Sequence, residues 1–178
     1  MIKDMLLLIF AVLAMLALAG GLFYLLAKRY FENQQKQQLL QMKLDERRET
    51  LKVVTPIRLQ AYERLALFLE RISPNSLVLR CYQPGMDLKL LQGVMTKNIR
   101  DEWEHNLSQQ VYVSEELWTH VREAKDEMVN LVNSAAVGLA DTTDPTRLAA
   151  SIFASAADRM PTNDALSALH HEVKELFG

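Results

Sequence analysis

Residues 5–27, MLLLIFAVLAMLALAGGLFYLLA, carry no charged side chain. An α-helix needs about 20 apolar residues to cross a hydrocarbon core roughly 30 Å thick, so this stretch is long enough to span one. We therefore expect residues 1–27 to form a transmembrane anchor, with the lipid bilayer as a first partner.

A cleaved signal peptide is the alternative interpretation of the same stretch. Residues 17–19, Ala-Leu-Ala, precede Gly20 and have the small-x-small pattern of a cleavage site. The apolar run continues well past Gly20, however, and Lys3 before it is offset by Asp4. Both features favour an uncleaved span.

The charges that flank the apolar run predict its orientation. Lys28 and Arg29 follow the run directly, whereas Lys3 is the only basic side chain before it. Short flanks rich in Lys and Arg stay in the cytoplasm, so we expect the N-terminus outside and the large C-terminal part inside. Tyr24 and Tyr30 bracket the inner end of the run. With Lys28 and Arg29, they are the expected membrane-interface residues.

The composition excludes one class of partner and suggests a compartment. The chain has 178 residues and a formal net charge of −2. This balance lacks the basic excess typical of nucleic-acid binding, so we expect no nucleic-acid partner. Cys81 is the single cysteine and cannot form an intrachain disulfide, which fits a reducing compartment. We expect Cys81 to be a buried small hydrophobe rather than a nucleophile.

Residues 28–54 have the composition of a polar helix. They contain no Pro or Gly and are rich in Gln, Lys, Glu, Leu and Met, so the anchor should continue into a juxtamembrane stalk helix. Leu40, Leu44, Leu51 and Val54 form an apolar stripe along it. The stripe is shorter than the three or four heptads of a coiled coil, which favours a solvated spacer. Self-association into a homo-oligomer through this stalk is the alternative.

Residues 55–178 predict a helical domain with clear start and stop signals. Thr55-Pro56 predicts a new helix, with Thr as N-cap and Pro at the first helical position. Asp87 and Ser114 are expected N-caps of two long amphipathic helices, and Gly138 is the expected end of the second. Pro145 suits another helix start. The expected fold class is therefore all-α, with a soluble bundle of about five helices.

For three features of this domain, the sequence allows two interpretations. LVLRCY at 77–82 fits either a helical turn or a brief extended piece. The polar segment 106–110, NLSQQ, fits an interhelical turn better than a recognition loop. Trp103 and Trp118 lie in phase with apolar faces, so we expect core packing rather than a ligand platform.

The helix after Pro56 should be among the most buried, with charges on its outer side. Its expected core face consists of Ala61, Leu65, Phe68, Leu69 and Ile72. Its expected outer side consists of Arg58, Glu63, Arg64, Glu70 and Arg71. A solvated face with local i, i+4 pairs is favoured for these charges over a charged rim around a docking surface.

Glu102 and His105 are the only residues whose spacing suggests a metal site. Glu-x-x-His places both side chains on one helical face, and di-iron bundles use two such pairs plus further Glu residues. The sequence holds no second copy, so Glu102 and His105 are weak metal candidates, and a hydrogen-bonding role is favoured. The adjacent His170 and His171 point about 100° apart on a helix and are expected to be solvated. We expect no catalytic residue and no cofactor.

Three strings of sequence resemble a known family. They are TPIRLQAYERLALFLERISPNSLVLR at 55–80, QPGM at 83–86 and DEWEHNLSQQVYVS at 101–114. Together they resemble an uncharacterised family of small bacterial single-span membrane proteins, over nearly the whole chain. The resemblance implies a helical protein anchored in the bacterial inner (cytoplasmic) membrane, and it implies no catalytic residues.

The expected function is that of a membrane-anchored, non-enzymatic interaction or scaffold protein. It would present the cytoplasmic helical domain to a protein partner, whose identity the sequence leaves open. Two alternatives remain: a metal-dependent or hydrolytic enzyme that uses Glu102 and His105, and an accessory subunit of a larger membrane complex.

Overall fold

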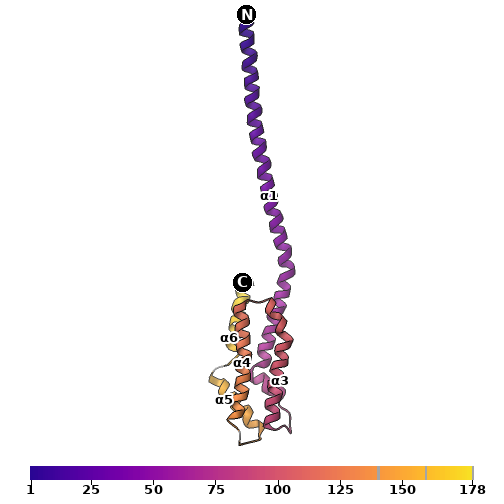
Figure 1. Ribbon diagram of the computed structural model, residues 1–178, viewed down its shortest axis with the longest axis vertical. Coiled ribbons are helices and arrows are strands. Elements are labelled where there is room, and N and C mark those ends of the chain that lie inside the picture. The colour runs from indigo at the N-terminus through magenta and orange to yellow at the C-terminus, as the bar shows by residue number, and fades with distance from the viewer. Residues whose placement is uncertain (140, 159, 178) are drawn as a thin grey trace. The chain divides into compact units, whose positions relative to one another are not determined.

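The computed structural model describes residues 1–139, 141–158 and 160–177, and these residues are all-α. They contain no strand, and their helices, shown in Figure 1, are α1 (Ile2–Ile72), α2 (Pro74–Cys81), α3 (Leu88–Asn106), the 3-10 helix η1 (Leu107–Val111), α4 (Glu115–Val137), α5 (Pro145–Asp158) and α6 (Asn163–Phe177). The chain divides into two compact units, Met1–Val53 and Val54–Gly178, which are described separately. The expected all-α class is confirmed.

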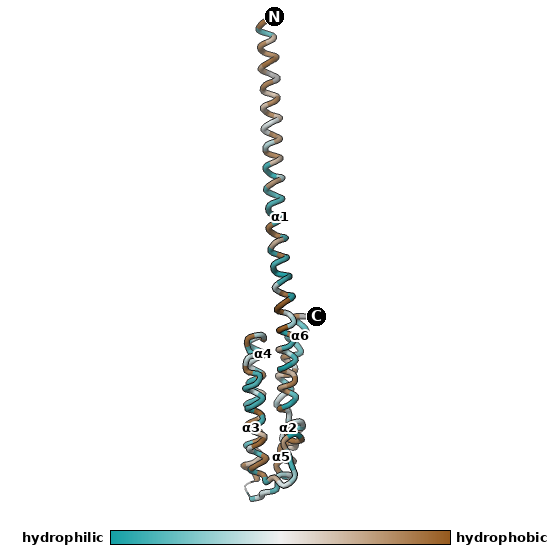
Figure 2. Tube along the Cα trace, turned by 90° about the vertical axis from the view of Figure 1, so that its right-hand side faces the viewer, coloured by the Kyte–Doolittle hydropathy of each residue, from teal (hydrophilic) through white to brown (hydrophobic). Residues whose placement is uncertain are grey.

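The first unit is helical from Ile2 onward. Its most apolar 18-residue window has a mean hydropathy of 2.7, and none of that window is buried within the protein. Figure 2 shows the hydrophobic colour over this part of α1, followed by a more hydrophilic segment. This helix is long and apolar enough to cross a membrane. Residues 28–53 are also helical, as their composition predicts.

The predicted helix start at Thr55-Pro56 is wrong. Helix α1 continues through Pro56 to Ile72. A proline inside a helix removes one N–H donor and crowds the carbonyl four residues earlier. Both Pro56 and Lys52 are exposed, so water can hydrate the Lys52 carbonyl that Pro56 leaves without a partner. The cost of the proline is therefore limited by its position on the surface.

The end of α1 contributes one face to the core of the second unit. Every residue of the predicted core face is buried, and Tyr62 joins them; the set is Ala61, Tyr62, Leu65, Phe68, Leu69 and Ile72. Ser73 and Pro74 interrupt the helix, and Pro74 then occupies the first turn of α2. Residues 77–81 are therefore helical, which settles the alternative that the sequence left open.

Helices α3 and α4 begin at the predicted caps. The Asp87 side chain accepts a hydrogen bond from the Leu90 N–H at 2.7 Å, and the Ser114 hydroxyl accepts one from the Leu117 N–H at 3.1 Å. Gly138 caps the C-terminus of α4, as expected. Gly85 has a positive φ of 88°, which a glycine adopts without strain, and it forms the turn before α3.

Helix α4 is the central element of the second unit. It contacts α3, α5 and α6, and Figure 1 shows it running beside α3. The core around it is one cluster; its fully buried members from α3 to α5 include Leu91, Met95, Ile99, Leu117, Val121, Met128, Val132, Leu148 and Ile152. Pro145 begins α5, as predicted.

Candidate functional site

A surface groove lies between the end of α1 and α3. Its volume is about 460 Å³, and its lining comprises Arg64, Leu67, Phe68, Arg71, Asn98, Asp101, Glu102, His105 and Asn106. Glu102 and His105, the weak metal candidates, therefore both face this groove, which we call the α1–α3 groove.

Glu102 forms ion pairs with two arginines, Arg71 and Arg80. Its Oε1 accepts hydrogen bonds from Arg71 Nε at 2.6 Å and from Arg80 Nη1 at 3.4 Å. The Glu102 side chain is only 17% exposed, whereas that of Arg71 is half exposed. Arg80 also donates to Asn98 Oδ1 at 2.9 Å and to the Arg71 carbonyl at 3.0 Å. This network fixes the Glu102 carboxylate by ion pairing across three helices.

The α1–α3 groove does not assemble a metal-ligand set in the part of the chain that the structure describes. No group of three His, Cys, Asp or Glu side chains close enough to hold an ion occurs among these residues. His105 is exposed, and Oε1 of Glu102 already accepts from Arg71 and Arg80. The arrangement is better suited to holding α1, α2 and α3 together than to acid–base chemistry.

A second polar cluster is built around Glu172 of α6. Glu172 Oε1 accepts hydrogen bonds from the Tyr62 hydroxyl at 2.7 Å, from the Ser114 N–H at 3.1 Å and from Arg58 Nη2 at 3.4 Å. The Ser114 hydroxyl also donates to Glu172 Oε2. The Glu172 side chain is 13% exposed. One carboxylate thus joins α1, the N-cap of α4 and α6, and its charge suits the positive end of α4.

Tyr62 is held in its neutral form by this cluster. Burial, and then the nearby Glu172 carboxylate, raise the pKa of the Tyr62 hydroxyl from 10.0 to about 12. The neutral phenol can therefore donate to Glu172 at any ordinary pH, while Arg58 Nη2 donates to the phenol oxygen at 2.8 Å.

The expected local i, i+4 ion pairs do not form at Arg58 and Arg71; the i, i+4 contact of Arg58 is its hydrogen bond to Tyr62. Arg58 reaches the Tyr112 carbonyl at 3.0 Å and Glu172 at 3.4 Å, and Arg71 reaches Glu102. Each of these partners lies on another element or loop. The sequence analysis missed Glu172 as a functional position because its partners are separated from it by 58 to 114 residues. Helical periodicity carries no information at that separation.

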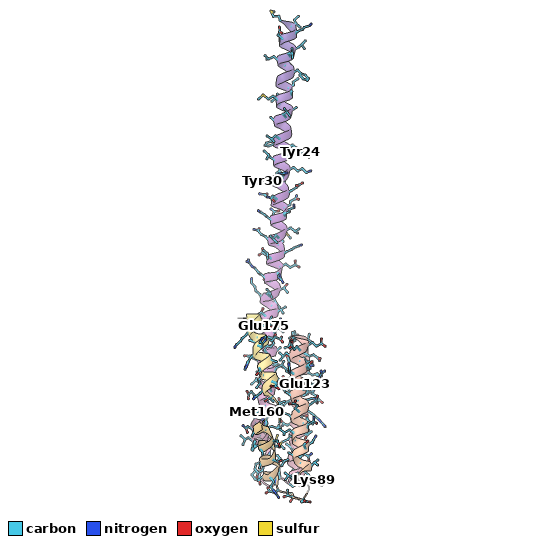
Figure 3. The ribbon with its side chains drawn as sticks, turned by 90° about the vertical axis from the view of Figure 1, so that its left-hand side faces the viewer. Tyr24, Tyr30, Lys89, Glu123, Met160 and Glu175 are labelled. Atoms are coloured by element: carbon cyan, nitrogen blue, oxygen red, sulfur yellow. The ribbon has the colours of Figure 1, made fainter. Side chains whose placement is uncertain are left out.

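The four expected membrane-interface residues lie close together on α1. Tyr24 and Tyr30, labelled in Figure 3, are six residues apart, which is about 9 Å along a helix axis. Both are exposed, as are Lys28 and Arg29. Lys28 lies 4.0 Å from Glu32, a contact at the limit of an ion pair. The basic side chains therefore remain available to solvent or to headgroups.

The remaining candidates have structural roles. Trp103 and Trp118 stack with ring centroids 4.7 Å apart, half-buried against the core. The Lys125 ammonium lies 5.1 Å from the Trp103 ring centroid. Cys81 is buried, as expected, and this burial raises the pKa of its thiol, which disfavours the reactive thiolate. In segment 106–110, Asn106 Nδ2 donates to the Glu102 carbonyl at 2.8 Å, and residues 107–110 belong to η1.

Comparisons with known proteins identify a family and no characterised relative. No curated protein and no solved structure matches the chain. The family described as "Family of unknown function (DUF7935)" matches residues 3–176. This match spans both compact units and agrees with the resemblance to an uncharacterised family. The chain therefore belongs to this family of unknown function, DUF7935.

Proposed function

We propose that this protein is a membrane-anchored, non-enzymatic interaction or scaffold protein. The observation that carries the proposal is the apolar helix at the start of α1, none of which is buried within the protein. A stretch of that hydropathy needs an apolar environment, and a bilayer supplies one of the right thickness.

The proposed topology places the N-terminus outside and the second unit in the cytoplasm. Lys28 and Arg29 follow the apolar stretch and are exposed, and the flank before it has Lys3 as its only basic side chain. The positive-inside rule then orients the helix. The bacterial inner membrane is the proposed location, and it rests on the resemblance of the three sequence strings to a bacterial family.

Exposed apolar side chains on the second unit support the binding of a protein. A groove of about 420 Å³ between α2 and α5 is lined mainly by apolar side chains, among them Leu79, Tyr82 and Phe153. Leu79 is 77% exposed. Exposed apolar side chains in a groove give a protein partner a surface that it can bury. The ion-paired state of Glu102 gives the competing metal-enzyme hypothesis no support.

Membrane fractionation and protease accessibility test the proposal. The full chain, tagged at its C-terminus, should stay in the membrane pellet after alkaline carbonate extraction. Protease added to intact spheroplasts should leave the tag intact, whereas protease added to inverted vesicles should remove it. A soluble chain, a mature N-terminus at Gly20 or a tag removed from outside would each contradict the proposal.

The interaction part of the proposal needs its own experiment. Photo-crosslinking from position 79 in intact membranes, followed by mild-detergent purification, should yield one defined covalent adduct. Position 63, on the exposed side of α1, is a matched control that should yield none. Equal labelling from both positions would show that the α2–α5 groove is not a specific surface.

A further inference from the structure

The stalk part of α1 has one face that combines apolar and basic side chains. At about 100° per residue, Leu40, Leu44 and Leu51 fall within a sector of about 40°. Their exposed fractions are 59%, 47% and 55%. The same spacing places Arg47 about 20° outside this sector and Lys43 about 60° outside it. We call these residues, together with Lys36 and Arg48 at the margins, the stalk face.

Three of the four acidic residues of segment 28–53 lie on the other side of the helix, and the fourth, Glu32, lies about 80° from Leu40 and pairs with Lys28. Asp45, Glu46 and Glu49 are about 120–180° from Leu40 around the axis. The ion pairs along residues 28–53 join Lys28 to Glu32, Arg48 to Asp45 and Lys52 to Glu49. Lys36, Lys43 and Arg47 take part in none of these pairs. The stalk face therefore presents an apolar seam beside three cations outside these ion pairs, whereas Arg48 at its margin is paired with Asp45.

A second copy of this helix is a poor occupant of the stalk face. Two copies anchored in one membrane would run parallel, so Arg47 would meet Arg47 near the seam and Lys43 would approach Arg48 of the other copy. Like charges brought together at a desolvated seam oppose pairing.

A lipid surface is also a poor occupant, because the stalk is an unbroken continuation of the apolar helix within one unit. Leu40 lies 13 residues beyond Ala27, which is about 20 Å along the axis, and Leu51 lies about 36 Å beyond it. Electrostatic attraction to headgroups falls off over about 8 Å at physiological ionic strength. The stalk face is thus out of reach of the membrane from which it would emerge.

We propose that the stalk face binds a parallel, acidic amphipathic helix from a different polypeptide. The partner helix would supply its own apolar seam, with carboxylates beside Lys43 and Arg48 and one carboxylate facing Arg47. This inference deepens the proposed function by giving the chemistry of a protein partner, and its direction of pairing rests on the membrane anchor.

A synthetic peptide tests the proposed charge complementarity directly. The probe is a fluorescein-labelled peptide of four heptads with Leu at positions a and d, except for one Glu opposite Arg47, and with Glu at e and g. A second peptide with Lys at e and g is the control. Fluorescence anisotropy with the full chain in neutral detergent should show binding of the Glu peptide at least about tenfold tighter than that of the Lys peptide. Equal affinities would overturn the proposal.

A matched pair of variants locates the binding on the stalk face. Arg47→Glu and Lys52→Glu change the net charge equally, but residue 52 lies about 120° from Leu40 around the helix. Arg47→Glu should weaken the Glu peptide at least about tenfold, whereas Lys52→Glu should change its affinity less than about twofold. Equal effects of the two variants would refute a face-specific site. Circular dichroism of both variants checks that the helix is retained.

Two further measurements would detect a second copy of the chain or a lipid surface on the stalk face. Sedimentation equilibrium of the full chain in detergent should give a monomer; a dimer that Leu44→Asp dissociates would establish a second copy instead. The full chain in nanodiscs that contain phosphatidylglycerol should bind the Glu peptide as tightly as the chain in phosphatidylcholine nanodiscs does. Weaker peptide binding in the anionic nanodiscs would show that lipid covers the stalk face. Peptide binding in detergent does not depend on carbonate extraction, so failure of this inference and failure of the anchor proposal are distinguishable.

Discussion

Replacing Glu172 by Ala should destabilise the second unit. The substitution removes the acceptor of the Tyr62 hydroxyl and of the Ser114 N–H and hydroxyl. A hydrogen bond to a charged group contributes about 1.5–3 kcal/mol to stability. Ser114 is exposed and can bond to water instead, so the bond from buried Tyr62 accounts for most of the loss.

We therefore expect Glu172→Ala to lower the free energy of unfolding by about 2–3 kcal/mol, and Glu172→Gln by roughly half of that, because the amide keeps one acceptor oxygen. Trp103 and Trp118 are the only tryptophans in the sequence, and both belong to the second unit. Their fluorescence during urea unfolding of the full chain in detergent therefore reports this unit alone.

Glu175 provides a matched control in the same helix. Its side chain is 70% exposed and lies 3.9 Å from His171, so Glu175→Ala should change the free energy of unfolding by less than about 0.5 kcal/mol. Figure 3 labels Glu175 near the end of α6. If Glu172→Ala proves no more destabilising than Glu175→Ala, the cluster around Glu172 is not a stabilising element and the reasoning fails.

Two further predictions use the same unfolding assay. The pKa of Tyr62 is about 12 in the folded chain and about 10 when unfolded, so the folded state keeps this proton longer, and the free energy of unfolding should fall as pH rises from about 10 to about 12. The Tyr62→Phe variant should show a shallower fall than the wild type, and an identical slope would refute the assignment. Leu65→Ala, at a fully buried site, should cost about 2–5 kcal/mol, whereas Leu67→Ala, at a 62% exposed site, should cost less than about 0.5 kcal/mol; similar losses would contradict the assigned core face.

Local signals in the sequence predict helix ends well in this chain, with one instructive exception. Asp87 and Ser114 are caps whose side chains act within three residues of themselves, so spacing alone identifies them. Pro56 carries an equally clear local signal, yet α1 continues through it. A proline signals a helix start only when the preceding turn lacks other support. Here the preceding residues are good helix formers and the affected carbonyl faces water.

The polar clusters could not be predicted, because they depend on helices meeting in three dimensions. Arg71 and Glu102 are 31 residues apart, and Arg58 and Glu172 are 114 apart. The sequence shows each as an ordinary surface charge on an amphipathic helix. Only the packing of α1 against α3 and α6 brings these charges together, with the Glu102 and Glu172 side chains 17% and 13% exposed. Glu102 and His105 show the opposite case. Their local Glu-x-x-His spacing suggests a metal site, but Arg71 and Arg80 already bind the Glu102 carboxylate.

Three parts of α1 carry apolar side chains, and each part differs in what can cover them. In the second unit, the apolar face of α1 is covered by the core, as Leu65 and Phe68 show. In residues 5–27, a bilayer can cover the apolar side chains. Leu40, Leu44 and Leu51 belong to neither group: they are roughly half exposed, and about 20–36 Å of helix separates them from the end of the apolar stretch. Exposed leucines that recur on one helical face gain from a covering helix, and Lys43 and Arg47, which take part in none of the ion pairs along residues 28–53, make an acidic helix the complementary one.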